Sequence, residues 1–513
     1  MNAIALSIFS SRIEAICDEM GAVLRRVAFS PNIKDRLDYS CAVFDAEGAL
    51  CAQAAHIPVH LGSMAYAMKD IVNKVDWHDG DMLMLNDPYL GGTHLPDVTM
   101  IAPVYVDQVL MGFVVNRAHH ADIGADSPGS MPMSSDLHEE GLVIPPTKIV
   151  VDKMINVKIM ARLIDGMRNP RESRGDFEAQ ISANRRGAER LSALIRKTGI
   201  EPYQQSLVAL NDYAEKLALA ALRQIADGDY GFEDVMDDDG MGQRDIPIRA
   251  SLSIRQGRVL VDFAGTADQV KGNINCPLSV AAAAVFYVFR CLMPAQTPAC
   301  AGTFRLIQLR APEGCLLNAK RPAAVAAGNV ETSSRVVDVV MGALARALPE
   351  KIPAASHGSM NNVAMGSVAQ AGQAAWDYYE TLGGGMGASR HRPGLSGVQT
   401  HMTNTLNTPV EAMEMYYPLR IKSYALRKGS GGEGRHTGGN GLVREYEFLS
   451  RTHVTLLTER REYRPWGLDS GGHARAGENI LNGKRLPAKC SLQLGAGDCL
   501  TVKTPGGGGF GQK

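Results

Sequence analysis

The chain has 513 residues, of which 45% are hydrophobic and 21% are charged, and its formal net charge is −1. This length predicts two or three subdomains, and the balanced charge gives no electrostatic basis for binding nucleic acid or an anionic membrane surface. The nine cysteines include no CxxC pair, so reduced thiols in the cytoplasm explain them better than a disulfide framework. No N-terminal secretion signal is apparent, and the longest apolar run, 278–289, is too short to span a bilayer.

The N-terminal residues predict a helix followed by a β-hairpin. Apolar side chains spaced by three and four residues predict an amphipathic helix over 4–28, which Pro31 ends. The segment 38–53 has the pattern of two short strands around a turn. Asp38 stands where the first strand begins, and its carboxylate is either a hydrogen-bonding group at the strand end or a general base that faces a cleft.

Two histidines follow in a segment that is expected to be a loop. His56 and His60 belong to this loop, which leads into a helix capped by Ser63. Seven of the 13 histidines lie between residues 56 and 138, so we place the chemistry in this part of the chain. His56 and His60 are candidates for orienting metal ligands, or they are ordinary hydrogen-bonding groups of a loop.

The stretch from residue 86 to residue 122 predicts an apolar hairpin with imidazoles and carboxylates at its open end. Alternating apolar residues, a turn at Asp107 and Gln108, and an apolar return strand indicate the hairpin. A hairpin brings its outer ends together, so residues about 25 apart in sequence become neighbours. The polar residues at these ends are His94, Asp97, His119, His120 and Asp122.

These residue types favour a metal site over polar side chains that merely end a strand. A His/His/Asp set suits a borderline divalent ion such as Zn²⁺, Mn²⁺ or Fe²⁺, and three protein ligands leave a position for water or substrate. The stretch contains no cysteine, which argues against a closed structural zinc site. The hairpin therefore predicts an open metal site.

The length of the turn decides which histidine faces Asp97. A two-residue turn places Asp97 opposite Ala118 and on the same face as His120, whereas one extra loop residue places it opposite His119. The residues themselves leave both registers open. Glu140, beyond the hairpin, is a fourth ligand, an acid/base group or a surface carboxylate.

The rest of the chain alternates between helix and strand patterns. Helical periodicity predicts an α-hairpin over 176–196 and 203–227, with Gln180 and Asn184 forming a polar pair that a solvated stripe would explain. Strand patterns follow at 246–263. Further helices are predicted after Pro277 and after a cap at Thr332 or Ser333, and glycine-rich turns punctuate short strands from about residue 371.

Together these patterns predict an α+β fold with mixed, largely antiparallel sheets, packed helices in several subdomains and a loop-rich β C-terminal part. We expect a metal-bearing catalytic subdomain, a helical hairpin, a mixed α/β subdomain and a glycine-rich β subdomain, over 1–170, 171–240, 241–370 and 371–513. The glycine clusters contain no G-x-x-x-x-G-K-[ST] motif and no strand-GxGxxG-helix unit. ATP binding by this chain alone is therefore not expected.

Six runs of residues, taken in order, resemble the hydantoinase B family. They are NDPYLGGTHLPD, NRAHHADIG, NVETSSRVVD, ETLGGGMGA, THMTNTLNTP and KGSGGEGRHTGGNGLVRE. The family includes the B half of ATP-dependent hydantoinases, oxoprolinases and lactamases, and the related subunit of acetone and acetophenone carboxylases. The likeness extends from Arg12 to the terminal GGGGFG.

The resemblance implies a division of labour between two subunits. A separate A-type subunit binds ATP and activates a carbonyl oxygen by phosphorylation, and the B-type chain holds a divalent metal and completes the reaction. The match of motifs implies that the metal ligands are His94, Asp97 and His119, which favours the register with the longer loop. The candidates for proton transfer are then Asp38, His120 and Glu140.

The main expectation is the metal-bearing B subunit of an ATP-dependent hydrolase that opens a hydantoin, a 5-oxoproline or a lactam ring. The first alternative is a subunit of an ATP-dependent carboxylase of a small ketone, although the chain is shorter than expected for that branch. The second is a non-catalytic scaffold with a structural metal. The resemblance suggests an A2B2 or larger assembly.

Overall fold

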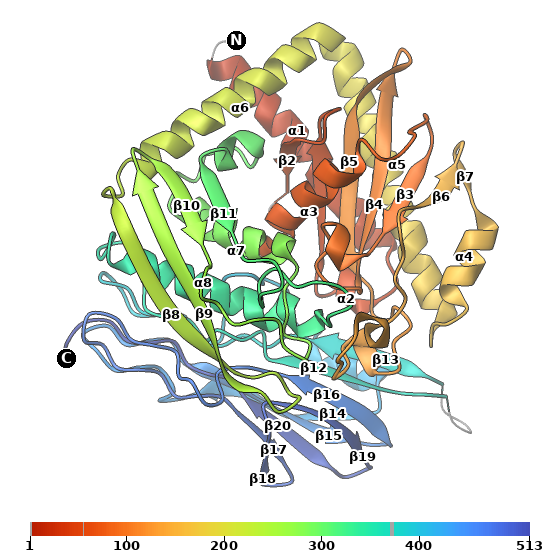
Figure 1. Ribbon diagram of the computed structural model, residues 1–513. Helices are drawn as coiled ribbons and strands as arrows, with labels where there is room; N and C mark the ends of the chain where they lie inside the picture. Colours follow the sequence, from red (N-terminus) through yellow and green to blue (C-terminus); the bar gives the residue numbers. More distant parts are fainter. Residues whose placement is uncertain (1–2, 55, 370–373) are drawn as a thin grey trace.

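A computed structural model describes residues 3–54, 56–369 and 374–513, which form four β-sheets covered and joined by helices (Figure 1). The first sheet contains, in spatial order, β2 (Leu50–Gln53), β1 (Tyr39–Phe44), β5 (Val109–His119), β4 (Asp97–Val106), β3 (Met82–Leu85), β6 (Thr147–Val151) and β7 (Met154–Ile155). The second contains β11 (Ile307–Arg310), β10 (Arg258–Asp262), β9 (Arg244–Arg255) and β8 (Gly228–Asp238).

Two further sheets make up the C-terminal part. One contains, in spatial order, β13 (Trp376–Glu380), β12 (Asn362–Ser367), β16 (Thr452–Leu457) and β19 (Lys489–Leu494). The other contains β14 (Leu419–Arg427), β15 (Gly441–Phe448), β20 (Cys499–Lys503), β17 (Glu478–Leu481) and β18 (Lys484–Leu486). Among the strands of the described residues, only β10 and β11 pair in parallel. The predicted α+β fold with largely antiparallel sheets is confirmed.

Helices cover both faces of the seven-stranded sheet, because its strands alternate apolar side chains between the two faces. On one face, Cys41 and Val43 of β1 share a core with α1 (Ala3–Val27) and α5 (Pro170–Thr198). On the other face, Ala42 and Phe44 pack with α3 (Pro58–Ile71). The helix over 4–28 and the hairpin over 38–53 are therefore confirmed.

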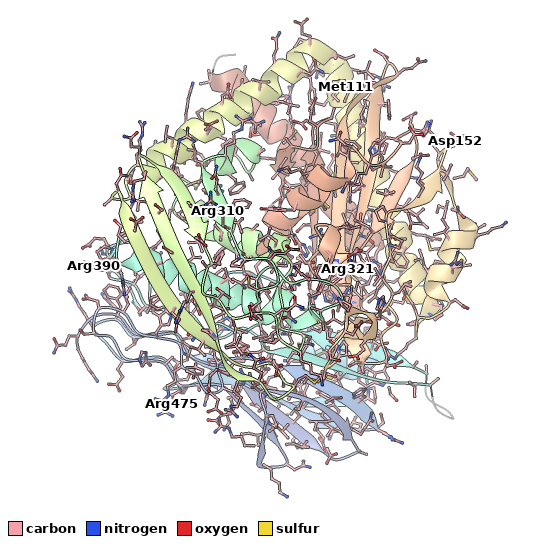
Figure 2. All side chains as sticks on the ribbon, in the orientation of Figure 1. Met111, Asp152, Arg310, Arg321, Arg390 and Arg475 are labelled. Atoms are coloured by element: carbon pink, nitrogen blue, oxygen red, sulfur yellow. The ribbon has the colours of Figure 1, made fainter. Side chains whose placement is uncertain are left out.

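The β4–β5 hairpin has the predicted two-residue turn and also an extra residue inside a strand. Val106 pairs with Val109 across Asp107 and Gln108, which both have positive φ angles of 50° and 65°, as expected for a tight hairpin turn. Val104 then pairs with Gly112 and Tyr105 with Leu110. Met111, labelled in Figure 2, is left as the bulged residue.

This bulge sets the register at the open end of the hairpin. Beyond it, Asp97 pairs with His119. The register implied by the family resemblance is confirmed, but its cause is different, because the extra residue lies in β5 and the turn keeps two residues.

The middle of the chain builds a second core. Helix α6 (Ile200–Leu222) follows α5 after Gly199 and extends from the first core to the second (Figure 1). Helices α7 (Leu278–Cys291) and α8 (Ser333–Ala345) pack with β8, β9 and β10 in the second core. The remaining helices are short: α2 (Pro31–Lys34), α4 (Val157–Ile164) and α9 (Val410–Tyr416).

The two C-terminal sheets face each other and share a core, to which Val363, Tyr446 and Leu500 belong. Glycine-rich segments beside these sheets run backbone against backbone, and carbonyl and amide groups of 383–387, 430–441 and 505–511 bond one another. Because β12 pairs with β13, one sheet spans the boundary expected near residue 371. The division into four units stays a prediction.

Several local predictions are wrong. Helix α3 begins at Pro58, so His60 lies in its first turn, and Ser63 lies inside the helix, where its hydroxyl bonds the carbonyl of Val59. The first turn of α8 follows a π-helical turn over Gly328–Thr332 and has no side-chain cap, so neither Thr332 nor Ser333 caps this helix as predicted.

A membrane span requires a helix of sufficient length and apolar character. Within the described ranges, none of the helices meets both conditions.

The polar pair Gln180 and Asn184 is buried against the sheet, so the expectation of a solvated stripe is also wrong. The amide nitrogen of Gln180 donates to the carbonyl of Val98 at 2.8 Å, and that of Asn184 donates to the carbonyl of Met100 at 3.0 Å. These bonds fix α5 on β4.

Candidate functional site

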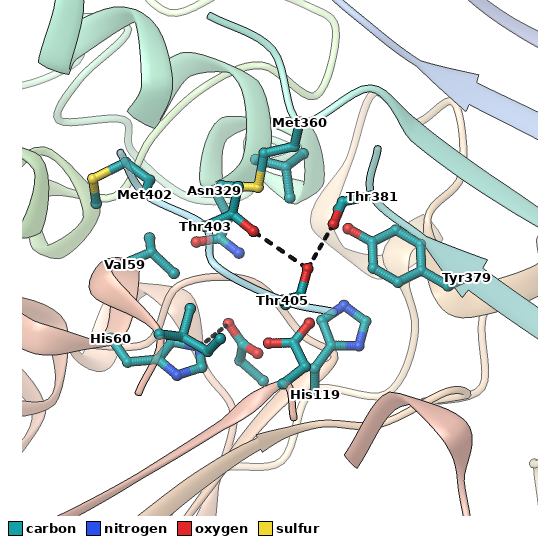
Figure 3. A pocket seen from close by; sticks show the side chains of 14 residues that line it. Val59, His60, His119, Asn329, Met360, Tyr379, Thr381, Met402, Thr403 and Thr405 are labelled. Carbon is teal, nitrogen blue, oxygen red and sulfur yellow. Dashed lines mark hydrogen bonds and ion pairs between the residues drawn. The ribbon is translucent and has the colours of Figure 1, made fainter. Parts of the chain in front are cut away.

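A small buried cavity lies where the first sheet, the start of α8 and the C-terminal part meet (Figure 3). Its volume is about 20 Å³, which accommodates a single water molecule. The cavity is lined by Asp38, Ile57, Val59, His60, Asp97, His119, Asn329, Val330, Met360, Tyr379, Thr381, Met402, Thr403 and Thr405.

Asp97 is the centre of a cluster of buried polar groups at the start of β4. Its Oδ2 atom lies 3.4 Å from Nε2 of His94 and 3.3 Å from Nε2 of His60, and it accepts a hydrogen bond from the hydroxyl of Thr93. Nδ1 of His94 lies 3.3 Å from the carbonyl oxygen of Ala326. The first turn of α3 and the loop before β4 therefore bring two imidazoles to one carboxylate at the start of β4.

His119 faces the same cavity from the end of β5. Its ring stacks on Tyr379 with 4.8 Å between ring centres and lies 5.0 Å from the ring of His94. Its Nδ1 atom is 3.0 Å from the amide nitrogen of Asn32, and its Nε2 atom is buried without a hydrogen-bond partner. The sequence-predicted ligands His94, Asp97 and His119 are thus neighbours.

The cluster combines a charged carboxylate with a neutral imidazole. Burial alone would raise the pKa of Asp97, but His94 and His60 outweigh it and hold the pKa of this carboxyl well below its usual value. Burial lowers the pKa of His119 well below its usual value, and the nearby His94 adds to this effect. Asp97 is therefore ionised and His119 neutral, which are the forms that bind metal ions. For His94, burial is outweighed by Asp97, which raises the pKa of this imidazole, so an ion would displace a proton from it.

The chemistry of these side chains fits a divalent ion, whereas their present orientation does not enclose one. Oδ1 of Asp97 and Nε2 of His119 are buried atoms of a kind that ligates metals, and neither has a hydrogen-bond partner. Among the residues that the structure describes, however, no group of three or more His, Cys, Asp or Glu side chains is arranged to hold an ion. An ion would require His94, Asp97 and His119 to turn toward a common point.

The contact between Asn32 and Nδ1 of His119 also bears on metal binding by this histidine. An imidazole that coordinates an ion through Nε2 carries its proton on Nδ1 and usually donates it to an oxygen. Asn32 provides that oxygen if its amide flips, because Nδ1 already lies within hydrogen-bond distance of the amide.

Asp38 lies in the cavity wall, and its role in proton transfer stays a prediction. Burial raises the pKa of its carboxyl, and the guanidinium of Arg36 opposes this shift. Nη2 of Arg36 is 3.9 Å from Oδ2 of Asp38. Asp38 is the one predicted proton-transfer group that the structure places in the cavity lining.

His120 and Glu140 lie behind the site. His120 points to the opposite face of the sheet, where its Nε2 atom lies 2.9 Å from Oε1 of Gln180 and its ring packs on Phe177. Oε1 of Glu140 accepts hydrogen bonds from Ser134 and from the backbone amides of residues 325 and 326, and burial raises the pKa of Glu140 to about 7. Neither residue lines the cavity, so direct contact of either with substrate would require a rearrangement.

Of the two loop histidines, His60 lines the cavity and His56 does not. His60 joins Ser40 to Asp97 through its two ring nitrogens, and its role in orienting a metal ligand stays a prediction. His56 accepts a hydrogen bond from the backbone amide of Cys41 and packs on Tyr39.

Reasoning from the sequence missed the part of the site that comes from distant segments. Asn329, Tyr379, Thr381, Thr403 and Thr405 all line the cavity, and the family-like runs NVETSSRVVD, ETLGGGMGA and THMTNTLNTP contain four of them. The runs themselves were therefore the available signal, since no periodicity or spacing connects residues so far apart.

Comparison with known proteins identifies the family. Residues 2–513 match the hydantoinase B/oxoprolinase family, and the chain belongs to that family. It is 39% identical over 521 residues to the protein MJ0963 of Methanocaldococcus jannaschii, covering 100% of this chain and 91% of that protein. It is 38% identical over 544 residues to 5-oxoprolinase 1 of Arabidopsis thaliana, covering 99% of this chain but only 42% of that protein.

Two solved structures share the fold. The ATP-dependent caprolactamase from Pseudomonas jessenii superposes with a TM-score of 0.93 at 26% identity, over 100% of this chain and 91% of that chain. A nucleotide-free acetone carboxylase chain gives a TM-score of 0.89 at 18% identity, over 99% of this chain and 76% of that chain. The second likeness establishes the fold alone.

Proposed function

We propose that this chain is the metal-bearing B-type subunit of an ATP-dependent cyclic-amide hydrolase that opens a hydantoin, 5-oxoproline or lactam ring. The observation that carries the proposal is the buried cavity in which Asp97, His94, His60 and His119 meet. One potential metal-ligating atom each of Asp97 and His119 has no hydrogen-bond partner there. The 5-oxoprolinase and caprolactamase names of its relatives support the substrate class.

The proposed reaction assigns separate tasks to the groups in the cavity. A divalent ion held by His94, Asp97 and His119 would supply Lewis-acid chemistry, which lowers the pKa of water to about 7. Asp38 would accept the proton of the attacking water at a carboxylate oxygen. His60 would hold Asp97 in place through its 3.3 Å contact. Tyr379 would keep the ring of His119 in its plane by stacking.

Substrate entry requires a wall of the cavity to move. A ring amide is larger than the single water molecule that the cavity accommodates. The segment 402–409 contributes Met402, Thr403 and Thr405 to the wall and has no regular secondary structure. We expect this segment to move when substrate binds.

The activation step is assigned to a partner. An unstrained amide is a poor electrophile, and phosphorylation of its oxygen makes the carbonyl carbon open to attack by water. The C–N bond then breaks as the ring nitrogen takes up a proton, and a second water releases phosphate from the acyl phosphate that remains. The sequence contains no phosphate-binding loop motif, so we assign ATP to a separate A-type subunit.

Product analysis tests the reaction type. The purified chain is combined with an A-type subunit, ATP, 5-oxoproline or a lactam, and labelled bicarbonate. We expect ring opening that depends on ATP, with no label in the product. Label retained in a new carboxylate would show the carboxylase alternative instead.

Metal analysis of the same complex tests the site. We expect about one divalent ion per chain, and we expect His119→Ala to lose both the ion and turnover by at least about a hundredfold while the complex still assembles. The matched control is His453→Ala, a half-buried histidine outside the cavity, which should keep both. Failure of the His119 variant to fold or assemble, with a coordinatively saturated ion in the unaltered protein, would indicate a scaffold.

A further inference from the structure

Three threonine hydroxyls form one wall of the cavity in front of a buried arginine. Oγ1 of Thr405 lies 2.8 Å from Oγ1 of Thr381 and 3.4 Å from that of Thr403 (Figure 3). Nη2 of Arg36 donates to Thr381 at 3.2 Å and to Thr405 at 3.5 Å. The guanidinium also stacks over the ring of Tyr379 at 4.8 Å. The proposed reaction assigns no chemical role to Arg36 or to the three threonines.

Arg36 fixes the direction in which these hydroxyls donate. A guanidinium only donates hydrogen bonds, so Thr381 and Thr405 accept from it and keep their own protons. One of these protons bridges the two threonines. The other points at an acceptor in the cavity or bonds Thr403 at 3.4 Å, in which case the proton of Thr403 is left. The wall therefore presents a hydrogen-bond donor.

The positive charge behind this wall is incompletely satisfied by the protein. Arg36 is fully buried, and its Nε atom has no hydrogen-bond partner in the described structure. Its nearest carboxylate is Asp38 at 3.9 Å, which is too far for a hydrogen bond. A buried cation is stabilised by a negatively charged partner. Arg36 has an unused N–H group and lies behind hydroxyl groups, so an anionic oxygen in the cavity would bind favourably there.

We propose that the hydroxyls of Thr381 and Thr405 bind an oxyanion of the substrate and that Arg36 is the residue that positions them. The inference deepens the proposed function and rests on it for the origin of the oxyanion. Two sources share this chemistry: the phosphoryl group on an activated amide, and a carboxylate on the ring, as in 5-oxoproline. Both present oxygen acceptors of matching charge.

Direct binding tests the subsite without the partner or ATP. Inorganic phosphate, 5-oxoproline and 2-pyrrolidinone are titrated by calorimetry into the metal-free full chain and into Thr381→Val and Thr405→Val, which remove only the hydroxyl. A hydrogen bond to a charged group is worth about 1.5–3 kcal/mol, so we expect each variant to weaken binding of the oxyanion at least about tenfold. Thr405→Ser, which keeps the hydroxyl, should restore it.

The matched control is Thr455→Val, which removes a buried hydroxyl bonded to Ser127 away from the cavity and should bind all three probes like the unaltered chain. Thermal unfolding checks that every variant folds. Weakened phosphate binding identifies the phosphoryl source. Selective weakening of 5-oxoproline against 2-pyrrolidinone identifies the ring carboxylate.

The inference is overturned if the valine variants bind phosphate and 5-oxoproline as the unaltered chain does, or if neither probe binds the unaltered chain. These outcomes are separate from failure of the proposed function, which would appear as absence of ATP-dependent ring opening in the complex while oxyanion binding persists.

Discussion

Two adjacent histidines show how position on a strand decides a residue's role. His119 faces the cavity and stacks on Tyr379, whereas His120 faces α5 and contacts Gln180. Successive side chains of a strand point to opposite faces, so only one of the two can meet Asp97. The bulge at Met111, which lies in β5 before both histidines, places His119 opposite Asp97.

Glu331 is a second residue whose protonation depends on its position in the fold. It is fully buried, and its Oε1 atom accepts hydrogen bonds from the backbone amide of Met360 and from the side chain of Asn362. Burial raises the pKa of Glu331 to about 8, and nearby Glu459 contributes to the rise. The folded protein therefore holds a proton on Glu331 at neutral pH that the unfolded chain releases.

This shift predicts a pH dependence of stability. Between the unfolded pKa of about 4.3 and the folded pKa of about 8, the folded state binds more protons, so the free energy of unfolding contributed by Glu331 falls as pH rises. We expect Glu331→Gln to flatten the decline in melting temperature between pH 5 and pH 9 by a few degrees. Glu313→Gln, at a residue with 74% side-chain exposure, is the control. A decline as steep as in the unaltered protein would refute the prediction.

At the scale of elements, the glycine-rich segments of the C-terminal part pack so closely that side chains are excluded. The amide of Gly507 donates to the carbonyl of Gly439, and that of Gly438 donates to the carbonyl of Gly432. A Cβ atom added to Gly438 would lie 1.8 Å from the carbonyl oxygen of Gly507. Glycine is therefore required by contact between backbones, whereas the sequence pattern alone suggested only turns.

Replacement of Gly438 by alanine should destabilise the protein strongly. The added methyl group meets a backbone atom that cannot move alone, and overpacking of this kind costs about 1–3 kcal/mol or more. Gly495→Ala is the matched control, because its nearest neighbour would be Asp498 at 3.8 Å, and its effect should stay within about 0.5 kcal/mol. Thermal unfolding compares the two variants, and equal melting temperatures would contradict the packing argument.

At the scale of the whole molecule, the cavity is closed only when three parts of the chain meet. The first sheet provides Asp38, Asp97 and His119, the turn before α8 provides Asn329, and the C-terminal part provides Tyr379 and the threonines. Arg36 ties the first part to the last by donating to the carbonyl of Tyr379 at 2.9 Å. Events in the cavity are therefore coupled to the association of these parts.

This coupling predicts that a bound ion stabilises the entire fold. A ligand that binds only the folded state at 100 times its dissociation constant adds about 2.7 kcal/mol. We expect Mn²⁺ to raise the melting temperature of the chelator-treated chain and to have no effect on Asp97→Ala. Mn²⁺ is the better probe than Zn²⁺, because the nine cysteines would bind Zn²⁺ in the unfolded chain. An equal response of both proteins would remove Asp97 from the proposed ligand set.

The sequence by itself determined the local features of this protein: the amphipathic helix α1, the two N-terminal hairpins, the apolar helix α7 and the approach of His94 and Asp97 to the adjacent pair His119 and His120. Each follows from residues close together in the chain, where periodicity and turn chemistry act directly. The start of α3 at Pro58 and the burial of Gln180 escaped such reasoning, because contacts with the sheet override local preference.

Only the tertiary structure decided which groups share the cavity. His119 faces Asp97 because of a bulge that no sequence pattern marks, and Thr381 and Thr405 reach the site from a part of the chain more than 240 residues beyond. Side-chain periodicity describes one element at a time, whereas a site is made where elements pack, and that packing depends on the burial of the whole chain.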